Sequence, residues 1–304
     1  AFGVDFSVAS DPETYERDLL NVNRGLLKYG TTSYCPTIVS SSAAVYHKLD
    51  QLKPEPPSLV LTLRVLSSTR PVLVLKVLQA NATNGFEDFK AVYGFEGKTP
   101  EAQAELTKKS QNSVCIITCA PELDGIMETI PDLVKCGITV SVGHSMANVS
   151  QAEEAVHKGA TFITHLFNAM PQFHHRDPGV IGLLGSSQDL PRPYYGLICD
   201  GIHVHPNSLT ERIFNSSFPH SVITLDACIR NFIQFTKCSL IEALEAVTLH
   251  PAVLLGIQET KGVIKPGADA DLVFLSDDLY VKRVFVAGEE VDLDSIDVQI
   301  TEKF

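Results

Sequence analysis

The chain has 304 residues, a length that suits one large domain or one domain with a small appendage. Its hydrophobic content of 44% and charged content of 20% exclude a globally disordered protein. The net charge is -12 and no cluster of Lys or Arg stands out, so we expect no nucleic-acid partner. No apolar run reaches the roughly 18–20 residues that span a bilayer, so we expect no membrane partner.

Seven cysteines are scattered along the sequence, and no two of them form a CxxC pair. Several lie inside apolar runs, as Cys115 does in SVCIITCAPE. We therefore expect reduced thiols that pack as small hydrophobic residues in the cytoplasm. The opening AFGVDFS has no signal-peptide pattern and no methionine, which predicts a fragment.

Strand-like and helix-like segments alternate along the first 227 residues. We expect helices over 11–30, 42–52, 124–137, 148–160 and 206–217. We expect strands within 31–40, 58–66, 112–122, 138–145, 161–170, 194–204 and 221–227.

Short, near-continuous apolar strands, most with a helix after them, indicate a parallel sheet covered by helices. A closed barrel of this kind needs eight strands, and the sequence offers seven, so the first strand would precede Ala1. We predict an α/β fold: a (β/α)8 TIM-like barrel, incomplete at its N-terminus. An open doubly wound sheet is the alternative, but no glycine-rich phosphate loop supports it.

The pattern changes after Asp226. Residues 229–256 are helical in character, and residues 261–293 form short strand-like runs broken by Gly, Pro and Asp. The second stretch predicts a small β module. No internal repeat or low-complexity segment interrupts this organisation.

Polar residues gather at the C-terminal ends of the expected strands, which is where parallel barrels place functional groups. Two histidines and an aspartate from successive strands would converge on one mouth of the barrel. Neutral imidazole and carboxylate groups suit a divalent metal such as zinc. The strand-end residues are Glu122, His144, His165, Asp200, His203 and Asp226.

The loop QFHHRDPG follows the strand that carries His165. Its Arg176 could bind a phosphate or carboxylate group in bidentate fashion. His174 and His175 are adjacent and are not expected to point into one site together, so we give them no ligand role.

These motifs resemble the amidohydrolase superfamily and, within it, the N-acetylglucosamine-6-phosphate deacetylases. VSVGHS, GATFITHLFNAM, HHRDPG, DGIHVHP and TLDA occur in that family's order and spacing, as do TSYCPT and APE. The tail HPAVLLGI…KGVIKPGADADLVFL is similar to the superfamily's general C-terminal signature. The resemblance implies a barrel over residues 1–254 and a small C-terminal β-sandwich segment, a remnant, over 255–304.

The resemblance also implies a reaction. His144 and His165 would bind one divalent, zinc-like metal ion per subunit, and Asp226 would act as general base and then as general acid. The acetamide of N-acetylglucosamine 6-phosphate would be hydrolysed to glucosamine 6-phosphate and acetate, a step in amino-sugar catabolism.

The same resemblance assigns the contacts to the phosphorylated amino-sugar substrate. Asn168 and Ala169 would hold the sugar phosphate through N–H groups, and His203 would contact the substrate. Arg176 would bind the phosphate across a subunit interface, which implies a homodimer.

The chain departs from the family in three places. The N-terminal sandwich strands and first barrel strand are absent, and after Ala227 a long segment with an active-site loop is absent, either through a skipped exon or through a genuine loop loss. The family's His-Leu-Glu-Gly-Pro-Phe motif, whose Glu is a metal ligand, is also absent. Read one nucleotide late, codons for that motif give Thr-Leu-Arg-Val-Leu-Ser, the sequence of residues 62–67. We hypothesise a reading-frame error over about residues 62–85.

Two other functions remain open from the sequence. A related amidohydrolase acting on a cyclic amide would bind its ligands without regard to phosphate. A non-catalytic pseudoenzyme is the second alternative, because a site of two histidines without the carboxylate would bind metal weakly.

Overall fold

A computed structural model of the chain describes residues 11–35, 84–93, 114–186, 189–209 and 223–296, with the isolated positions 4, 37, 38, 72, 73, 99, 102, 104, 216 and 217. The strand predicted over 58–66 and the helix predicted over 42–52 lie outside these residues. So does nearly all of the segment 62–85 in which we expect a changed reading frame.

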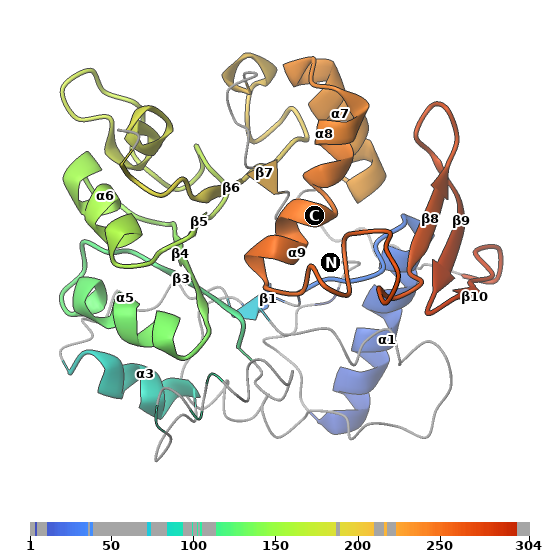
Figure 1. The fold of residues 1–304 in the computed structure, drawn as a ribbon, viewed down its shortest axis with the longest axis horizontal. Coiled ribbons are helices and arrows are strands. Elements are labelled where there is room, and N and C mark those ends of the chain that lie inside the picture. The colour runs from blue at the N-terminus through green and yellow to red at the C-terminus, as the bar shows by residue number, and fades with distance from the viewer. Residues whose placement is uncertain are drawn as a thin grey trace.

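The centre of the molecule is a sheet whose neighbouring strands all run parallel, as the sequence predicted (Figure 1). Within the described residues its order follows the chain from one edge strand, β1, to the other, β7. The strands are β1 (Thr37–Ile38), β2 (Val72–Leu73), β3 (Ile116–Cys119), β4 (Thr139–Val142), β5 (Phe162–Ile163), β6 (Tyr194–Gly196) and β7 (Ser216–Ser217).

Helices α3 (Phe86–Tyr93), α5 (Ile126–Lys135) and α6 (Val149–His157) lie together beside strands β3 to β5 (Figure 1). The start of α6 is fixed by a capping box. Asn148 Oδ1 accepts a hydrogen bond from the Gln151 N–H at 2.9 Å, and Gln151 Oε1 accepts one from the Asn148 N–H at 3.1 Å. This cap sets where the loop after β4 ends.

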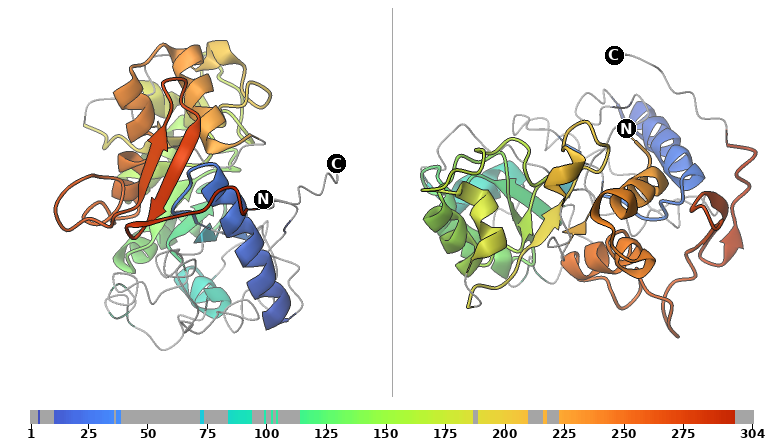
Figure 2. Two further views of the ribbon diagram at one scale, coloured as in Figure 1. Left: turned by 90° about the vertical axis from the view of Figure 1, so that its right-hand side faces the viewer. Right: turned by 90° about the horizontal axis from the view of Figure 1, so that it is seen from above.

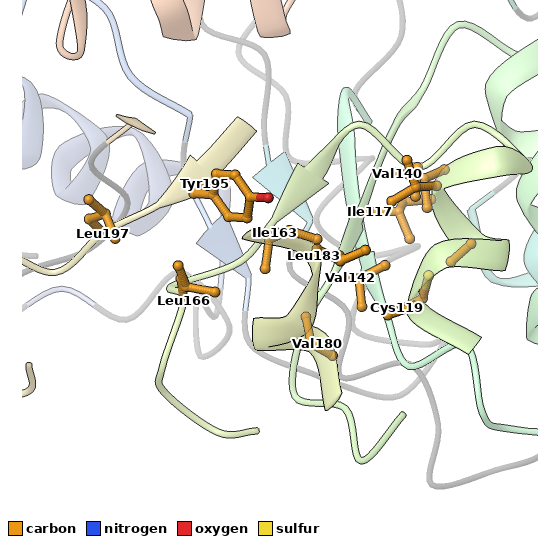
Figure 3. Close-up of a cluster of buried hydrophobic side chains, with 14 of the residues drawn as sticks. Ile117, Cys119, Val140, Val142, Ile163, Leu166, Val180, Leu183, Tyr195 and Leu197 are labelled. Carbon is orange, nitrogen blue, oxygen red and sulfur yellow. The ribbon is translucent and has the colours of Figure 1, made fainter. Parts of the chain in front are cut away.

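The largest hydrophobic core lies where these helices meet the sheet. Because a parallel sheet is covered on both faces, its strands are apolar almost without interruption. Figure 3 shows side chains from adjacent strands packed together with residues of the loops that follow them. They include Ile117, Cys119, Val140, Val142, Ile163, Leu166, Val180, Leu183, Tyr195 and Leu197.

Two sequence predictions near the end of the sheet are wrong. The helix expected over 206–217 is wrong at both ends. Pro206–Ser208 is a short 3-10 turn, η4, and Ser216 and Ser217 pair with β6 and extend the sheet as β7. Residues 210–215 lie outside the described part of the chain. The end of the strand expected over 221–227 is helical: α7 (Leu225–Thr236) begins after Thr224.

The start of α7 at Leu225 agrees with the apolar pattern of the residues that follow. Cys228, Ile229 and Phe232 form an apolar stripe at helical spacing, and all three are buried. The stripe extends the helix back through Leu225–Ala227.

The remaining chain contains α8 (Leu240–Glu245), α9 (Leu249–Leu254) and a small antiparallel sheet. This sheet has the order β10 (Glu289–Glu290), β9 (Val281–Val286), β8 (Leu272–Leu275), so the predicted small β module is confirmed. Helix α1 (Pro12–Lys28) lies against it in both views of Figure 2. Within the described residues, no helix has both the length and the apolar composition that crossing a bilayer requires.

Candidate active site

The two histidines predicted as metal ligands occupy equivalent positions on neighbouring strands. Val142 and Ile163 are partners in the parallel register of β4 and β5, and His144 and His165 each follow two residues later. Both side chains therefore leave the sheet at its C-terminal edge, as the sequence predicted.

The structure brings these histidines into direct contact. Their Nε2 atoms are 2.8 Å apart, and the rings meet edge to face with centroids 4.6 Å apart. Two nitrogens that bind one zinc ion tetrahedrally at about 2.0–2.1 Å lie about 3.3 Å apart, so a small separation of the rings would admit such an ion. The pair therefore fits two ligand positions of one divalent ion.

The His165 ring has the properties of a neutral ligand. Burial lowers the pKa of His165 below its usual range, and it outweighs the neighbouring backbone of His165, Asn168 and Thr164, which raises this pKa. A charge on His203 lowers the pKa of His165 further. Its Nδ1 atom is buried without a hydrogen-bond partner. Neutral imidazole is the form that binds metals.

The described residues do not complete a metal site. No group of three or more His, Cys, Asp or Glu side chains able to hold a metal is found in the described part of the chain. Within these residues the histidine pair therefore offers two candidate ligands and no more.

The backbone around the pair is strained. His144 (φ 51°), His165 (φ 30°), Phe167 (φ 77°) and Ala169 (φ 49°) all lie in the left-handed region, which residues with a Cβ rarely occupy. Such outliers persist only where the surroundings determine the conformation, and they cluster at functional sites. This concentration supports the two strand-end loops as the functional region.

Three buried hydroxyl side chains lie directly beneath the histidines. Thr164 Oγ1 is 2.9 Å from Thr118 Oγ1 and 2.5 Å from Ser141 Oγ, so one group on β3, one on β4 and one directly after β5 join a single network. Gly143 packs against the same Thr164: a Cβ at this position would lie 2.5 Å from Thr164 Cβ. Sequence reasoning missed these residues, because hydroxyls in an apolar strand resemble ordinary core positions.

Asp200 and His203 form a second polar pair, at the end of β6. His203 Nδ1 is 2.6 Å from Asp200 Oδ2, and Asp200 Oδ1 accepts the N–H groups of Ile202 (2.8 Å) and His203 (2.9 Å). Burial raises the pKa of Asp200, but these hydrogen bonds outweigh it, so the pKa lies below its usual range. The carboxylate fixes the orientation of a half-exposed imidazole.

The predicted phosphate-binding residues lie on the loop after His165. The Asn168 N–H donates to the His165 carbonyl at 2.9 Å, and the Asn168 side chain lies 3.4 Å from the Leu166 carbonyl. Ala169 is exposed, and so is Arg176, further along the same loop. Asn168 and Ala169 are thus close to the histidine pair along the chain.

Asp226 is placed differently from what the strand pattern predicted. It lies in the first turn of α7, where its Oδ2 accepts a hydrogen bond from Arg230 Nη1 at 2.9 Å. Its Oδ1 is buried without a partner. Sequence reasoning missed Arg230, although the four-residue spacing of opposite charges was a usable signal once a helix was considered.

A parallel α/β sheet with a histidine pair at its C-terminal edge is typical of amidohydrolases, and residues 220–291 match the amidohydrolase family. The chain is 39% identical to the N-acetylglucosamine-6-phosphate deacetylase of Mus musculus, over 95% of this chain and 80% of the relative. Against the human relative of the same name the identity is 37%, with the same coverage. The chain belongs to the N-acetylglucosamine-6-phosphate deacetylase family.

Solved structures of deacetylases with this name share the fold of this chain. The N-acetyl-D-glucosamine-6-phosphate deacetylase of Mycobacterium smegmatis superposes with a TM-score of 0.71 at 26% identity, covering 96% of this chain and 83% of that one. The enzyme of Pasteurella multocida superposes with a TM-score of 0.68 at 25% identity, again over 96% and 83%.

Proposed function

We propose that this chain hydrolyses the acetamide of N-acetylglucosamine 6-phosphate, giving glucosamine 6-phosphate and acetate. The observation that carries the proposal is the contact between His144 and His165 at the strand ends, in a chain 39% identical to a deacetylase of this name. We propose these two side chains as ligands of one divalent ion. When bound, such an ion polarises the amide carbonyl and acidifies a water molecule.

The roles proposed for the other side chains follow from the family resemblance. Asp226 accepts the proton of the attacking water at its unpaired Oδ1 and then donates it to the departing amine. His203, oriented by Asp200, contacts the sugar. N–H groups of Asn168 and Ala169, together with the guanidinium of Arg176, bind the phosphate.

We also propose the finer architecture. The parallel sheet belongs to an eight-stranded barrel over residues 1–254, and residues 255–304 belong to a small β-sandwich. The superposition on the Mycobacterium smegmatis enzyme supports this arrangement. A cytoplasmic homodimer stays a prediction. The seven cysteines, all within the described residues, form no disulfide, which agrees with a reducing compartment.

The test is acetate release from N-acetylglucosamine 6-phosphate and from unphosphorylated N-acetylglucosamine. We expect turnover of the phosphorylated sugar that a chelator abolishes. Arg176→Ala should raise KM by about 10- to 100-fold, because a charged hydrogen bond to the phosphate is lost. Arg192→Ala is the matched control, since this exposed arginine precedes β6 at the opposite edge of the sheet. Equal rates with both sugars would contradict the proposal.

A second candidate function is binding without hydrolysis. It is favoured by the lack of a third ligand among the described residues and by the ion pair that holds Asp226. In that case the phosphorylated sugar would bind and Arg176→Ala would weaken binding, while acetate release stayed at the background rate.

A further inference from the structure

Glu122 connects the turn after β3 to the loop that carries His144. Its Oε1 accepts the Met146 N–H at 2.5 Å, and its Oε2 accepts the Ser145 hydroxyl at 2.7 Å. The Ser145 oxygen, fully buried, in turn accepts the Ala147 N–H at 3.1 Å. One carboxylate thus orders the three residues that follow His144.

We infer that Glu122 is a positioning residue for metal binding: it holds the loop after β4 so that His144 Nε2 faces His165 Nε2. The inference rests on the proposed function of the histidine pair. Glu122 itself does not join these histidines in a metal-binding group within the described residues. It acts through the Ser145 hydroxyl and the Met146 N–H.

The conformation of His144 explains why such a support is needed. His144 has φ 51°, a left-handed conformation that is unfavourable for a residue with a Cβ. It is maintained because Gly143, on one side, packs closely against Thr164 and because Glu122 holds the residues on the other side. Without Glu122, nothing else in the described contacts holds the Met146 N–H.

The chemistry of the contact requires a carboxylate. An ionised Glu only accepts hydrogen bonds, and its two oxygens accept one N–H and one O–H at the same time. A Gln side chain has one oxygen, so it can keep the Met146 N–H but meets the Ser145 hydroxyl with an amide N–H. Glu122→Gln should therefore retain part of the support and Glu122→Ala none.

The position of a metal ligand has to be held within about 0.5 Å, and loss of a group that orients a ligand weakens metal affinity by about 10- to 100-fold. A residue that only stabilises the loop would change thermal stability and leave the metal affinity as it was. Metal affinity in a folded variant separates these two roles.

The experiment is a Co²⁺ titration of the full chain, with the visible absorption of bound Co²⁺ as a readout of coordination geometry. We expect Glu122→Ala to weaken Co²⁺ binding by about 10- to 100-fold and to alter the spectrum, and Glu122→Gln to have an intermediate effect. Asp124→Asn is the matched control: Asp124 is exposed on the same turn, and no hydrogen bond or ion pair is found for it in the described residues. Asp124→Asn should have the Co²⁺ affinity and the absorption spectrum of the wild-type protein.

Hydrogen exchange over residues 144–148 in metal-free protein provides a second measurement. We expect faster exchange there in Glu122→Ala, with α5 and α6 unchanged. Unchanged exchange in this loop would overturn the inference, and so would faster exchange with wild-type Co²⁺ affinity. If His144→Ala binds Co²⁺ as tightly as the wild-type protein, the proposed metal site is wrong. The hydrogen exchange of Glu122→Ala still shows, in that case, whether Glu122 holds the loop.

Discussion

At the scale of single residues, the candidate site depends on unfavourable backbone conformations. Four residues with a Cβ, between His144 and Ala169, have left-handed φ values, and each such residue costs about 1–3 kcal/mol. The contacts that offset this cost are small and specific: the buried hydroxyl network beneath Thr164 and the hydrogen bonds to Glu122. Small changes in packing here should therefore disturb the histidine pair.

Gly143→Ala tests this dependence. The added methyl group would lie 2.5 Å from Thr164 Cβ and 3.1 Å from Thr118 Cγ2, so the strand ends have to move apart. We expect a loss of about 1–3 kcal/mol in the free energy of unfolding, measured by urea denaturation, as for other overpacked cores. The movement should also weaken Co²⁺ binding, because Gly143 is next to His144.

Gly185→Ala is the control for Gly143→Ala. A methyl group at Gly185 has nothing within 4 Å, so the free energy of unfolding should change by no more than about 0.5 kcal/mol. If both variants have the stability of wild type, the close approach of the two strands is not what shapes the site.

The sequence was sufficient to predict that His144 and His165 lie at one edge of the sheet, because each follows a strongly apolar strand and the ends of parallel strands share an edge. It was not sufficient to predict the network of Thr118, Ser141 and Thr164. That network depends on the register of three strands, and register follows from packing that a single sequence does not reveal.

At the scale of elements, α7 is held in place by contacts of a single arginine. Arg230 Nη1 donates to Asp226 Oδ2 at 2.9 Å and to the Leu279 carbonyl at 2.8 Å, and its guanidinium lies 4.1 Å from the centre of the Tyr280 ring. One arginine thus links the first turns of α7 to the turn between β8 and β9. Asp226 is held in this arrangement by a partly buried ion pair.

Arg230→Met tests the strength of that link. Removing the guanidinium leaves the buried Asp226 carboxylate without its partner, and an unsatisfied buried group costs about 1–3 kcal/mol of unfolding free energy. In a double-mutant cycle with Asp226→Asn, the coupling energy should fall between about 0.5 and 3 kcal/mol.

The control for Arg230→Met is Arg17→Met. Arg17 is exposed on α1 and faces Asp18 at 3.4 Å, so its removal should change stability by no more than about 0.5 kcal/mol. Equal effects of the two arginines, or additive effects of Arg230→Met and Asp226→Asn, would contradict a structural ion pair.

This region also shows where prediction from the sequence failed. Residues 221–227 are rich in β-branched and apolar side chains, which favours a strand. Leu225–Ala227 nevertheless form the first turn of α7, directly before the buried stripe of Cys228, Ile229 and Phe232. Likewise, Ser216 and Ser217 have a low intrinsic propensity for strands, and they form β7 because they pair with β6. In both cases tertiary packing overrode local propensity.

At the scale of the whole molecule, the two ends of the chain share one hydrophobic cluster. Leu27 of α1 packs with Val284, Val286 and Ile296, and the Lys28 ammonium donates to the Ile296 carbonyl at 3.3 Å. Figure 2 shows α1 alongside the C-terminal strands. The C-terminal sheet is therefore stabilised by a helix more than 240 positions earlier in the chain.

Leu27→Ala tests whether this contact supports the C-terminal sheet. Leu27 is 4% exposed, so its truncation leaves a cavity and should lower the free energy of unfolding by about 2–5 kcal/mol. Leu184→Ala is the control: at 41% exposure, Leu184 should cost less than about 1 kcal/mol. Hydrogen exchange locates the effect, and we expect Leu27→Ala to speed exchange in β8 and β9 while β3 and β4 keep their protection. If β8 and β9 exchange as slowly as in wild type, the C-terminal sheet is stable without α1, and the two ends of the chain are energetically independent.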